Sequence, residues 1–141
     1  MSTIKAAITA VGAYVPDFVL TNKALESMVD TNEEWITSRT GIKERRILKE
    51  EGKGTSFLAI KAAQNLLAKA NVDPLEIDLL IMATATPDMP VASTGAYVAT
   101  EIGATNAFAY DLQAGCSSFL FGMSTAAAYI ESGRYKKVLL I

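Results

Sequence analysis

Residues 77–83 read Ile-Asp-Leu-Leu-Ile-Met-Ala, a short run that is apolar apart from Asp78. Runs of this kind are typical of parallel strands that are covered on both faces. Helical apolar spacing precedes the run over residues 55–70 and follows it over residues 92–102. The alternation continues with an expected strand over 107–111, a helix over 116–130 and a strand over 137–141. Strands that alternate with helices predict an α/β fold with a largely parallel sheet.

The chain before residue 55 is less regular, and its elements are predicted from caps and β-branched residues. A helix is expected to begin at Thr31, whose hydroxyl can form a capping box with the carboxylate of Glu34. Gly41 supplies the C-terminal stop of this helix. The other expected elements are a strand over 4–15, a short helix over 22–29 capped by Thr21, and a charged strand or hairpin arm over 42–48.

The composition excludes several kinds of site. The chain has 141 residues, a single cysteine and no histidine. It therefore cannot form an internal disulfide, a Cys/His zinc site or a complete Ser-His-Asp or Cys-His catalytic unit by itself, and no metal site is predicted. The formal charge of −2 gives no electrostatic reason to expect nucleic acid as a partner. With 50% hydrophobic residues, the chain is expected to form one globular domain over 1–141.

Three segments bear on the location and the extent of the protein. Residues 112–130 form an uncharged stretch long enough to suggest a membrane span, but their Gln, Ser, Thr, Ala and Gly content favours a helix buried in a soluble protein. The N-terminus lacks the pattern of a signal peptide, so we expect a cytoplasmic protein without a membrane partner. Residues 138–141 end inside an apolar strand, which predicts a piece of a longer protein whose C-terminal half is absent.

Cys116 is the candidate catalytic residue. It follows the strand expected over 107–111, and Gly115 permits a sharp turn into the next helix. Amides at a helix N-terminus stabilise a thiolate and can bind a developing oxyanion, which together suit acyl transfer through a thioester. Because the following helix is apolar on every face, Cys116 is expected to lie deep, at the end of a tunnel. The alternative is that Cys116 is simply a small buried hydrophobic residue. Asp73 and Asp78 are expected to cap elements and to carry no chemistry.

Two motifs resemble those of a known family. The stretches Asp30-Thr-Asn-Glu-Glu-Trp-Ile-Thr-Ser-Arg-Thr-Gly-Ile-Lys-Glu-Arg45 and Asp111-Leu-Gln-Ala-Gly-Cys-Ser-Ser-Phe119 resemble the β-ketoacyl-acyl-carrier-protein synthase III family, the thiolase-fold enzymes that start type II fatty acid synthesis. The resemblance runs from about Ile8 to Ile141. It implies the N-terminal half of a duplicated thiolase-like fold, with five αβαβα layers and a mainly parallel mixed sheet. It also implies a homodimer.

The resemblance implies an enzymatic role for Cys116. This residue would take the acyl group from acyl-CoA as a thioester, with its own backbone amide as an oxyanion donor. Condensation with malonyl-acyl-carrier-protein and loss of carbon dioxide would follow. The family's His and Asn, which support the decarboxylation, lie in the C-terminal half. Acyl-CoA is a substrate in this scheme, so no cofactor is implied, and the 141-residue chain alone is expected to be inactive.

A site for the CoA adenine is implied at Thr31, Trp35 and Arg39. Trp35 and Arg39 are four residues apart on one helix face, so an indole and a guanidinium can face a flat base together. Without the resemblance, a half-buried Trp beside a salt-bridged Arg is the alternative. Arg45 and Arg46 could meet CoA phosphates or the carrier protein, although a solvated strand face is the simpler interpretation.

Two residues depart from the family pattern. Met89 stands where many members have an aromatic residue that reaches across the dimer and closes the partner's acyl pocket. Methionine is more pliable, so we hypothesise a pocket that accepts longer or branched primers as well as acetyl. Ser118 stands where the family usually has Gly shortly after the cysteine, and it is expected to tighten the helix start.

The function expected from the sequence is that of a 3-oxoacyl-acyl-carrier-protein synthase III, an acyltransferase. Two alternatives remain open. One is another thiolase-fold acyltransferase, such as a hydroxymethylglutaryl-CoA synthase or a polyketide starter synthase. The other is a non-catalytic module that binds CoA or acyl carrier protein.

Overall fold

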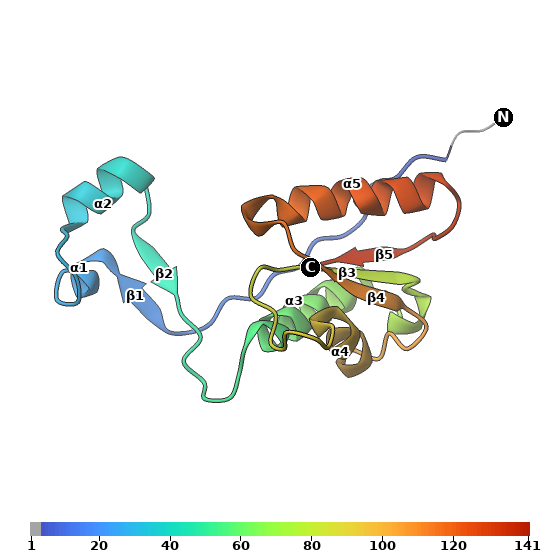
Figure 1. The fold of residues 1–141 in the computed structure, drawn as a ribbon, viewed down its shortest axis with the longest axis horizontal. Coiled ribbons are helices and arrows are strands. Elements are labelled where there is room, and N and C mark those ends of the chain that lie inside the picture. The colour runs from blue at the N-terminus through green and yellow to red at the C-terminus, as the bar shows by residue number, and fades with distance from the viewer. Residues whose placement is uncertain (1–3) are drawn as a thin grey trace. The chain divides into compact units, whose positions relative to one another are not determined.

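The computed structural model describes residues 4–141, which divide into two compact units. The first unit contains the residues up to Tyr14 together with Gly54–Ile141, and the second contains Val15–Lys53. Each unit has its own small sheet and its own helices (Figure 1). No helix in the described part of the chain is both long and apolar enough to cross a membrane.

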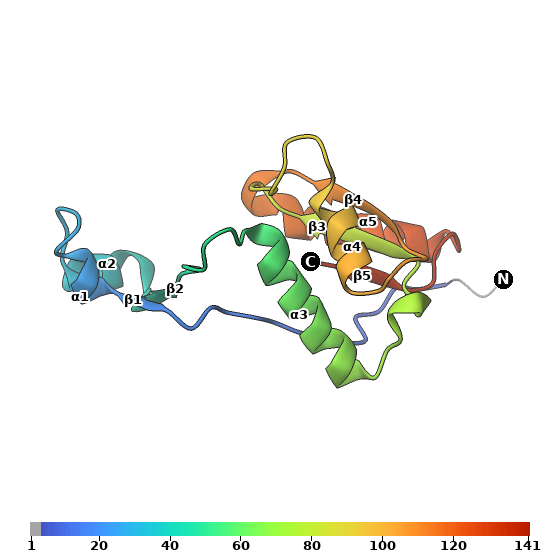
Figure 2. The same cartoon turned by 90° about the horizontal axis from the view of Figure 1, so that it is seen from below.

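The first unit is built on a parallel three-stranded sheet with the order β4-β3-β5. Helix α5 covers one face of this sheet, and α3 and α4 cover the other (Figures 1 and 2). This three-layer arrangement confirms the predicted α/β fold. Its elements are α3 (Thr55–Ala70), β3 (Leu79–Ala83), α4 (Thr94–Glu101), β4 (Phe108–Leu112), α5 (Ser118–Glu131) and β5 (Val138–Leu140), with the short 3₁₀ helices η1 (Pro74–Glu76) and η2 (Gly115–Ser117).

The central strand β3 is buried on both faces, as its apolar run predicts. Leu80 and Met82 belong to the core cluster, which also contains Ala59, Ala63 and Leu67 of α3 and Val98 and Ala99 of α4. Because side chains alternate along a strand, Leu79 and Ile81 point to the opposite face, toward α5. Leu79, Leu80 and Ile81 are each 0% exposed, and burial of such a side chain contributes about 1.5–3 kcal/mol.

Strand β5 is fastened to the sheet at its beginning by Asp78. The Asp78 carboxylate accepts hydrogen bonds from the backbone N–H groups of Lys137, at 3.0 Å, and Lys136, at 2.8 Å. These two bonds hold the pKa of the Asp78 carboxyl below its usual value of 3.8. The structure thus confirms Asp78 as a capping residue, and Asp73 likewise caps η1.

The second unit is organised around a buried asparagine. Its elements are β1 (Val19–Thr21), α1 (Asn22–Leu25), α2 (Glu33–Thr40) and β2 (Glu44–Arg46), with β1 and β2 antiparallel. The Asn22 amide nitrogen donates to the Ile42 carbonyl at 2.7 Å and to Thr37 Oγ1 at 3.2 Å. Its Oδ1 accepts from Arg45 Nη1 at 2.6 Å. This 0%-exposed side chain therefore ties α1 to α2 and to β2.

The strand expected over residues 4–15 is absent from the structure, in which this segment forms no ladder. It packs on α3 instead: the Ala13 N–H donates to Asn65 Oδ1 at 3.3 Å, and a Cβ on Gly12 would lie only 2.6 Å from Leu66 Cβ. β-branched residues favour extended backbone, but they do not supply a partner strand. The prediction was wrong because this segment has no hydrogen-bonded partner strand among the described residues.

The start of α2 also differs from the predicted one. Asn32, not Thr31, is the N-cap, and its Oδ1 accepts the Trp35 N–H at 2.8 Å. Asparagine caps helices at least as well as threonine, so the helix begins one residue later and the predicted Thr31–Glu34 box does not form. Gly41 ends the helix with a φ of 70°, as expected. Helix α1 has the predicted Thr21 cap but ends at Leu25, four residues early.

Candidate functional site

Cys116 lies in a sharp turn between β4 and α5. The turn is the 3₁₀ helix η2, which continues directly into α5. Gly115 has a φ of 55°, a left-handed conformation that favours glycine, although nothing lies within 4 Å of where its Cβ would be. Conformation rather than space therefore demands glycine at this position. The prediction that Cys116 stands beside a helix start is confirmed.

The backbone amides of this turn differ in whether they donate a hydrogen bond. The Ser117 N–H donates to the Ala114 carbonyl at 3.1 Å, and the Ser118 N–H donates to the Gly115 carbonyl. Within residues 4–141, no hydrogen bond occupies the backbone N–H of Cys116. An unoccupied backbone N–H on the same residue as an exposed thiol is the kind of donor that an oxyanion needs.

Cys116 is exposed among the described residues, so neither the predicted deep tunnel nor the alternative of a buried hydrophobic cysteine is observed in this part of the protein. Helix α5 packs on the sheet by one face only. Its Phe119, Leu120 and Phe121 side chains are 51%, 62% and 56% exposed. A helix that is apolar on every face is expected to be covered on both sides. Among the described residues, the sheet covers α5 on one side only.

Met89 lies in the loop over residues 84–93, which joins β3 to α4. Its side chain is about half exposed, and Val91 beside it is fully exposed. The loop is anchored next to Met89: the Asp88 carboxylate accepts the Ser56 N–H at 3.1 Å, and the Asp88 N–H donates to Thr94 Oγ1 at 3.2 Å. These bonds connect the loop to the first turns of α3 and α4.

Asp111, near the end of β4, completes this network. Its carboxylate accepts hydrogen bonds from the N–H groups of Thr94, at 2.8 Å, and Gly95, at 2.7 Å, and from the Ser93 hydroxyl at 3.0 Å. A carboxylate at a helix N-terminus is stabilised by unpaired amides and by the helix dipole. Asp111 thus fixes the first turn of α4 to the strand that leads into the Cys116 turn.

The Met89 loop and the Cys116 turn emerge at the same edge of the sheet. Strands β3 and β4 are parallel, and their last residues, Ala83 and Leu112, are register partners. The loop over 84–93 follows β3, and the turn over 113–117 follows β4. Ligands of open α/β sheets bind at the carboxyl ends of the strands. The structure therefore brings two of the predicted site segments to the edge where binding is expected.

The predicted adenine-binding residues belong to the second unit. Trp35 is 57% exposed on α2, and Arg39 is exposed one turn later. Arg39 makes no ion pair with any described residue, so the alternative of a half-buried Trp beside a salt-bridged Arg does not apply. Thr31 precedes the helix and is half-buried. The α2 face thus presents an indole and a guanidinium that are both available for contact.

Arg45 and Arg46 have structural partners. Arg45 is half-buried and donates to Asn22. Arg46 Nη1 donates to the Pro16 carbonyl at 3.3 Å, and its Nε lies 3.8 Å from Glu44 Oε1. The solvated-face interpretation is therefore wrong for Arg45, because the buried amide of Asn22 requires a donor for its oxygen.

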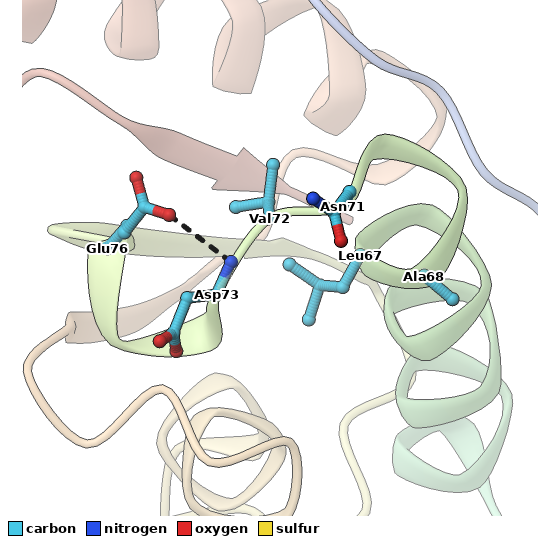
Figure 3. A pocket seen from close by; sticks show the side chains of 6 residues that line it. All are labelled: Leu67, Ala68, Asn71, Val72, Asp73 and Glu76. Carbon is cyan, nitrogen blue, oxygen red and sulfur yellow. Dashed lines mark hydrogen bonds between the residues drawn. The ribbon is translucent and has the colours of Figure 1, made fainter.

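A cavity of about 430 Å³ lies at the C-terminal end of α3 (Figure 3). Its lining residues are Leu67, Ala68, Asn71, Val72, Asp73 and Glu76. The Glu76 carboxylate lines this cavity. It accepts the Asp73 N–H at 3.3 Å and also bonds Lys137, so the carboxylate already has partners within the fold. No candidate site residue lines this cavity. Residues 4–141 also contain no group of three His, Cys, Asp or Glu side chains that could hold a metal ion.

Comparison with known proteins finds similarity to one family of enzymes. A family model described as 3-oxoacyl-[acyl-carrier-protein (ACP)] synthase III matches residues 110–141, the segment that contains Cys116. The β-ketoacyl-[acyl-carrier-protein] synthase III 2 of Bacteroides thetaiotaomicron is 53% identical over 141 residues, which are 100% of this chain and 42% of that protein. The chain is therefore similar to the N-terminal part of 3-oxoacyl-acyl-carrier-protein synthase III proteins.

Solved structures show the same similarity. The 3-oxoacyl-[acyl-carrier-protein] synthase III from Aquifex aeolicus VF5 matches 99% of this chain and 44% of its own, with a TM-score of 0.89 and 43% identity. The priming β-ketosynthase from the R1128 polyketide biosynthetic pathway matches 98% of this chain and 41% of its own, with a TM-score of 0.91 and 36% identity. The predicted thiolase-like fold is therefore confirmed. The chain spans about 42% of the length of the curated relatives it matches.

Three structural features were missed from the sequence. They are the Asp111 carboxylate at the start of α4, the Asp88 anchor of the Met89 loop, and Asn22 in the second unit. A signal for Asp111 was present, because an aspartate near the end of an otherwise apolar strand needs polar partners. Asp88 and Asn22 left no local signal, since their partners are distant in sequence.

Proposed function

We propose that the protein containing this chain is a 3-oxoacyl-acyl-carrier-protein synthase III, which starts type II fatty acid synthesis by joining an acyl-CoA primer to malonyl-acyl-carrier-protein. The observation that carries the proposal is the Cys116 turn: an exposed thiol at a helix start, beside its own unoccupied N–H, inside the segment that the family model matches. The segment 1–141 serves as the N-terminal thiolase-like domain of this enzyme, which we place in the cytoplasm.

The chemistry assigned to Cys116 has two parts. In the first, its thiolate attacks the thioester carbonyl of acyl-CoA, the Cys116 N–H stabilises the oxyanion, and CoA leaves as a thiolate that takes up the proton lost by the Cys116 thiol. In the second, malonyl-acyl-carrier-protein loses carbon dioxide, and the electron pair left on its carbon attacks the acyl-Cys116 carbonyl. The Cys116 thiolate then leaves, and the product is a 3-oxoacyl-acyl-carrier-protein.

Substrate recognition is assigned to the remaining predicted residues. Trp35, Arg39 and Thr31 hold the CoA adenine, and the exposure of Trp35 and Arg39 on one helix face supports this assignment. Met89 closes the acyl pocket of a partner subunit, and its exposed position in an anchored loop supports that role in a homodimer. Acyl-CoA is a substrate in this account, and we propose no cofactor.

A polyketide starter synthase is the second candidate, because the R1128 priming β-ketosynthase is 36% identical with a TM-score of 0.91. Substrate turnover by the full-length protein separates the candidates. We expect decarboxylative condensation of acetyl-CoA with a malonyl carrier protein of fatty acid synthesis. A strict requirement for a polyketide carrier protein would favour the second candidate. Turnover of acetoacetyl-CoA instead would indicate a hydroxymethylglutaryl-CoA synthase, and binding without turnover would indicate a non-catalytic module.

A further inference from the structure

The side chain of Ser118 spans the turn that carries Cys116. Its Oγ accepts the Ala114 N–H at 2.7 Å and donates to the Gly115 carbonyl at 2.8 Å. Ser118 is 2% exposed, so water does not compete for these bonds. One hydroxyl therefore connects the two residues before Cys116 to the first residue of α5. Neither the family match nor the proposed chemistry gives Ser118 a role.

The direction of these bonds is unusual for a serine at a helix start. Such a serine commonly accepts an N–H two or three residues ahead in the helix. Ser118 instead bonds backward, to residues four and three positions earlier. The backbone that it holds is irregular, with φ and ψ of −144° and 33° at Ala114 and a φ of 55° at Gly115. The hydroxyl thus supports a turn that the backbone does not favour by itself.

We propose that Ser118 is a positioning residue for Cys116, an inference that rests on the function proposed above. By occupying the Ala114 N–H and the Gly115 carbonyl, the hydroxyl fixes the turn in which the Cys116 N–H stays unoccupied. The thiolate and the oxyanion donor belong to one residue, so the acyl carbonyl meets both only in this backbone conformation. Ser118 acts through Cys116 and need not touch the substrate.

Ser117 provides a matched control. It is the neighbouring serine, it is exposed, and its side chain makes no capping hydrogen bond. Ser118→Ala and Ser117→Ala therefore remove the same hydroxyl from adjacent positions, one bonded across the turn and one not. Ser118→Thr and Ser118→Val form a second pair of nearly equal shape that differ by the hydroxyl alone.

The test is single-turnover acylation of the full-length protein by acetyl-CoA over a range of concentrations. For Ser118→Ala we expect the maximal acylation rate to fall at least tenfold, while the concentration for half-maximal rate stays within twofold. Ser117→Ala should match the unmodified protein in both quantities. If Ser118→Ala fails to fold, the Thr and Val variants decide: the first should acylate at least fivefold faster than the second. Equal rates within either pair, or a change in half-saturation alone, would overturn the proposal.

Amide hydrogen exchange provides a readout that does not depend on the proposed function. We expect the Ala114 amide to lose protection in Ser118→Ala and to keep it in Ser117→Ala and Ser118→Thr. Unchanged protection in Ser118→Ala would overturn the positioning role. If the unmodified protein is not acylated by any acyl-CoA, the proposed function fails, while the exchange result still decides whether Ser118 holds the turn.

Discussion

Asn22 shows how one side chain can determine the stability of a unit. Its amide makes three hydrogen bonds at 0% exposure, to Thr37, Ile42 and Arg45. Removing a buried partner leaves the other groups unsatisfied, at about 1–3 kcal/mol for each such group. The second unit has few other buried side chains, among them Ile36. Its stability therefore depends on this amide to an unusual degree.

We predict that Asn22→Ala lowers the free energy of unfolding of the second unit by about 2–3 kcal/mol. Amide hydrogen exchange across residues 15–53 is the measurement. Asn106→Ala is the control, since Asn106 makes one exposed hydrogen bond, to the Leu75 carbonyl. Equal effects of the two substitutions would contradict the role given to Asn22.

Substitution of Met89 can test which acyl-CoA primers the full-length protein accepts. Its flexible side chain is the reason for expecting a pocket that accepts longer or branched acyl groups. Met89→Phe replaces it with a larger and more rigid side chain, so we expect the preference for acetyl-CoA over a branched acyl-CoA to rise about tenfold. Competition between the two acyl-CoA substrates on the full-length enzyme measures this ratio. A strict preference for acetyl in the unmodified enzyme would eliminate the hypothesis.

At the scale of elements, the start of α4 depends on a residue of β4. Asp111 accepts three hydrogen bonds from Ser93, Thr94 and Gly95, and bonds to a charged acceptor are stronger than neutral ones. Asp111→Ala removes all three, so we predict a loss of about 2–3 kcal/mol in the stability of the first unit. The same change should loosen the loop over 84–93.

Urea denaturation measures the stability change of Asp111→Ala, and hydrogen exchange over residues 84–95 measures the loop. Asp73→Ala is a suitable control, because it removes a carboxylate that caps only the short helix η1. Unchanged loop exchange in Asp111→Ala would show that the network does not hold the Met89 loop.

The helices and strands of the first unit could be predicted from the local pattern of apolar residues. The apolar run of β3 and the 3.6-residue spacing of α3 are strong signals, and both elements occur where predicted. Residues 4–15 could not be predicted this way, because a strand depends on a partner elsewhere in the chain. The Cys116 turn was predictable from the adjacent Gly115. The hydrogen bonds of Asp111 and Asn22 were not predictable, since hydrogen bonds between segments distant in the chain produce no periodic pattern in the sequence.

At the scale of the whole molecule, acid should weaken the attachment of β5. The backbone bonds from Lys137 and Lys136 lower the pKa of the Asp78 carboxyl in the folded state below 3.8. The ionised carboxylate therefore stabilises the fold in full above the unfolded pKa, and this contribution disappears as the pH falls through the folded pKa. We predict that Asp78→Asn is less stable than the unmodified chain at pH 7 and that the difference shrinks below about pH 4.

Thermal unfolding from pH 7 to pH 2.5 measures this dependence. Asp17→Asn serves as a control, since no hydrogen bond of the Asp17 carboxylate is present among residues 4–141. A stability difference for Asp78→Asn that stays constant across the range would show that the carboxylate charge does not contribute.

We propose Cys116 as the acyl-accepting nucleophile of a 3-oxoacyl-acyl-carrier-protein synthase III. The most direct measurement is incubation of the full-length protein with radiolabelled acetyl-CoA, followed by peptide mapping of the label. We predict one acetyl group per chain on the peptide that contains Cys116, its release on addition of malonyl-acyl-carrier-protein, and no label on Cys116→Ala. Label on another residue, or none on a folded protein, would contradict this proposal.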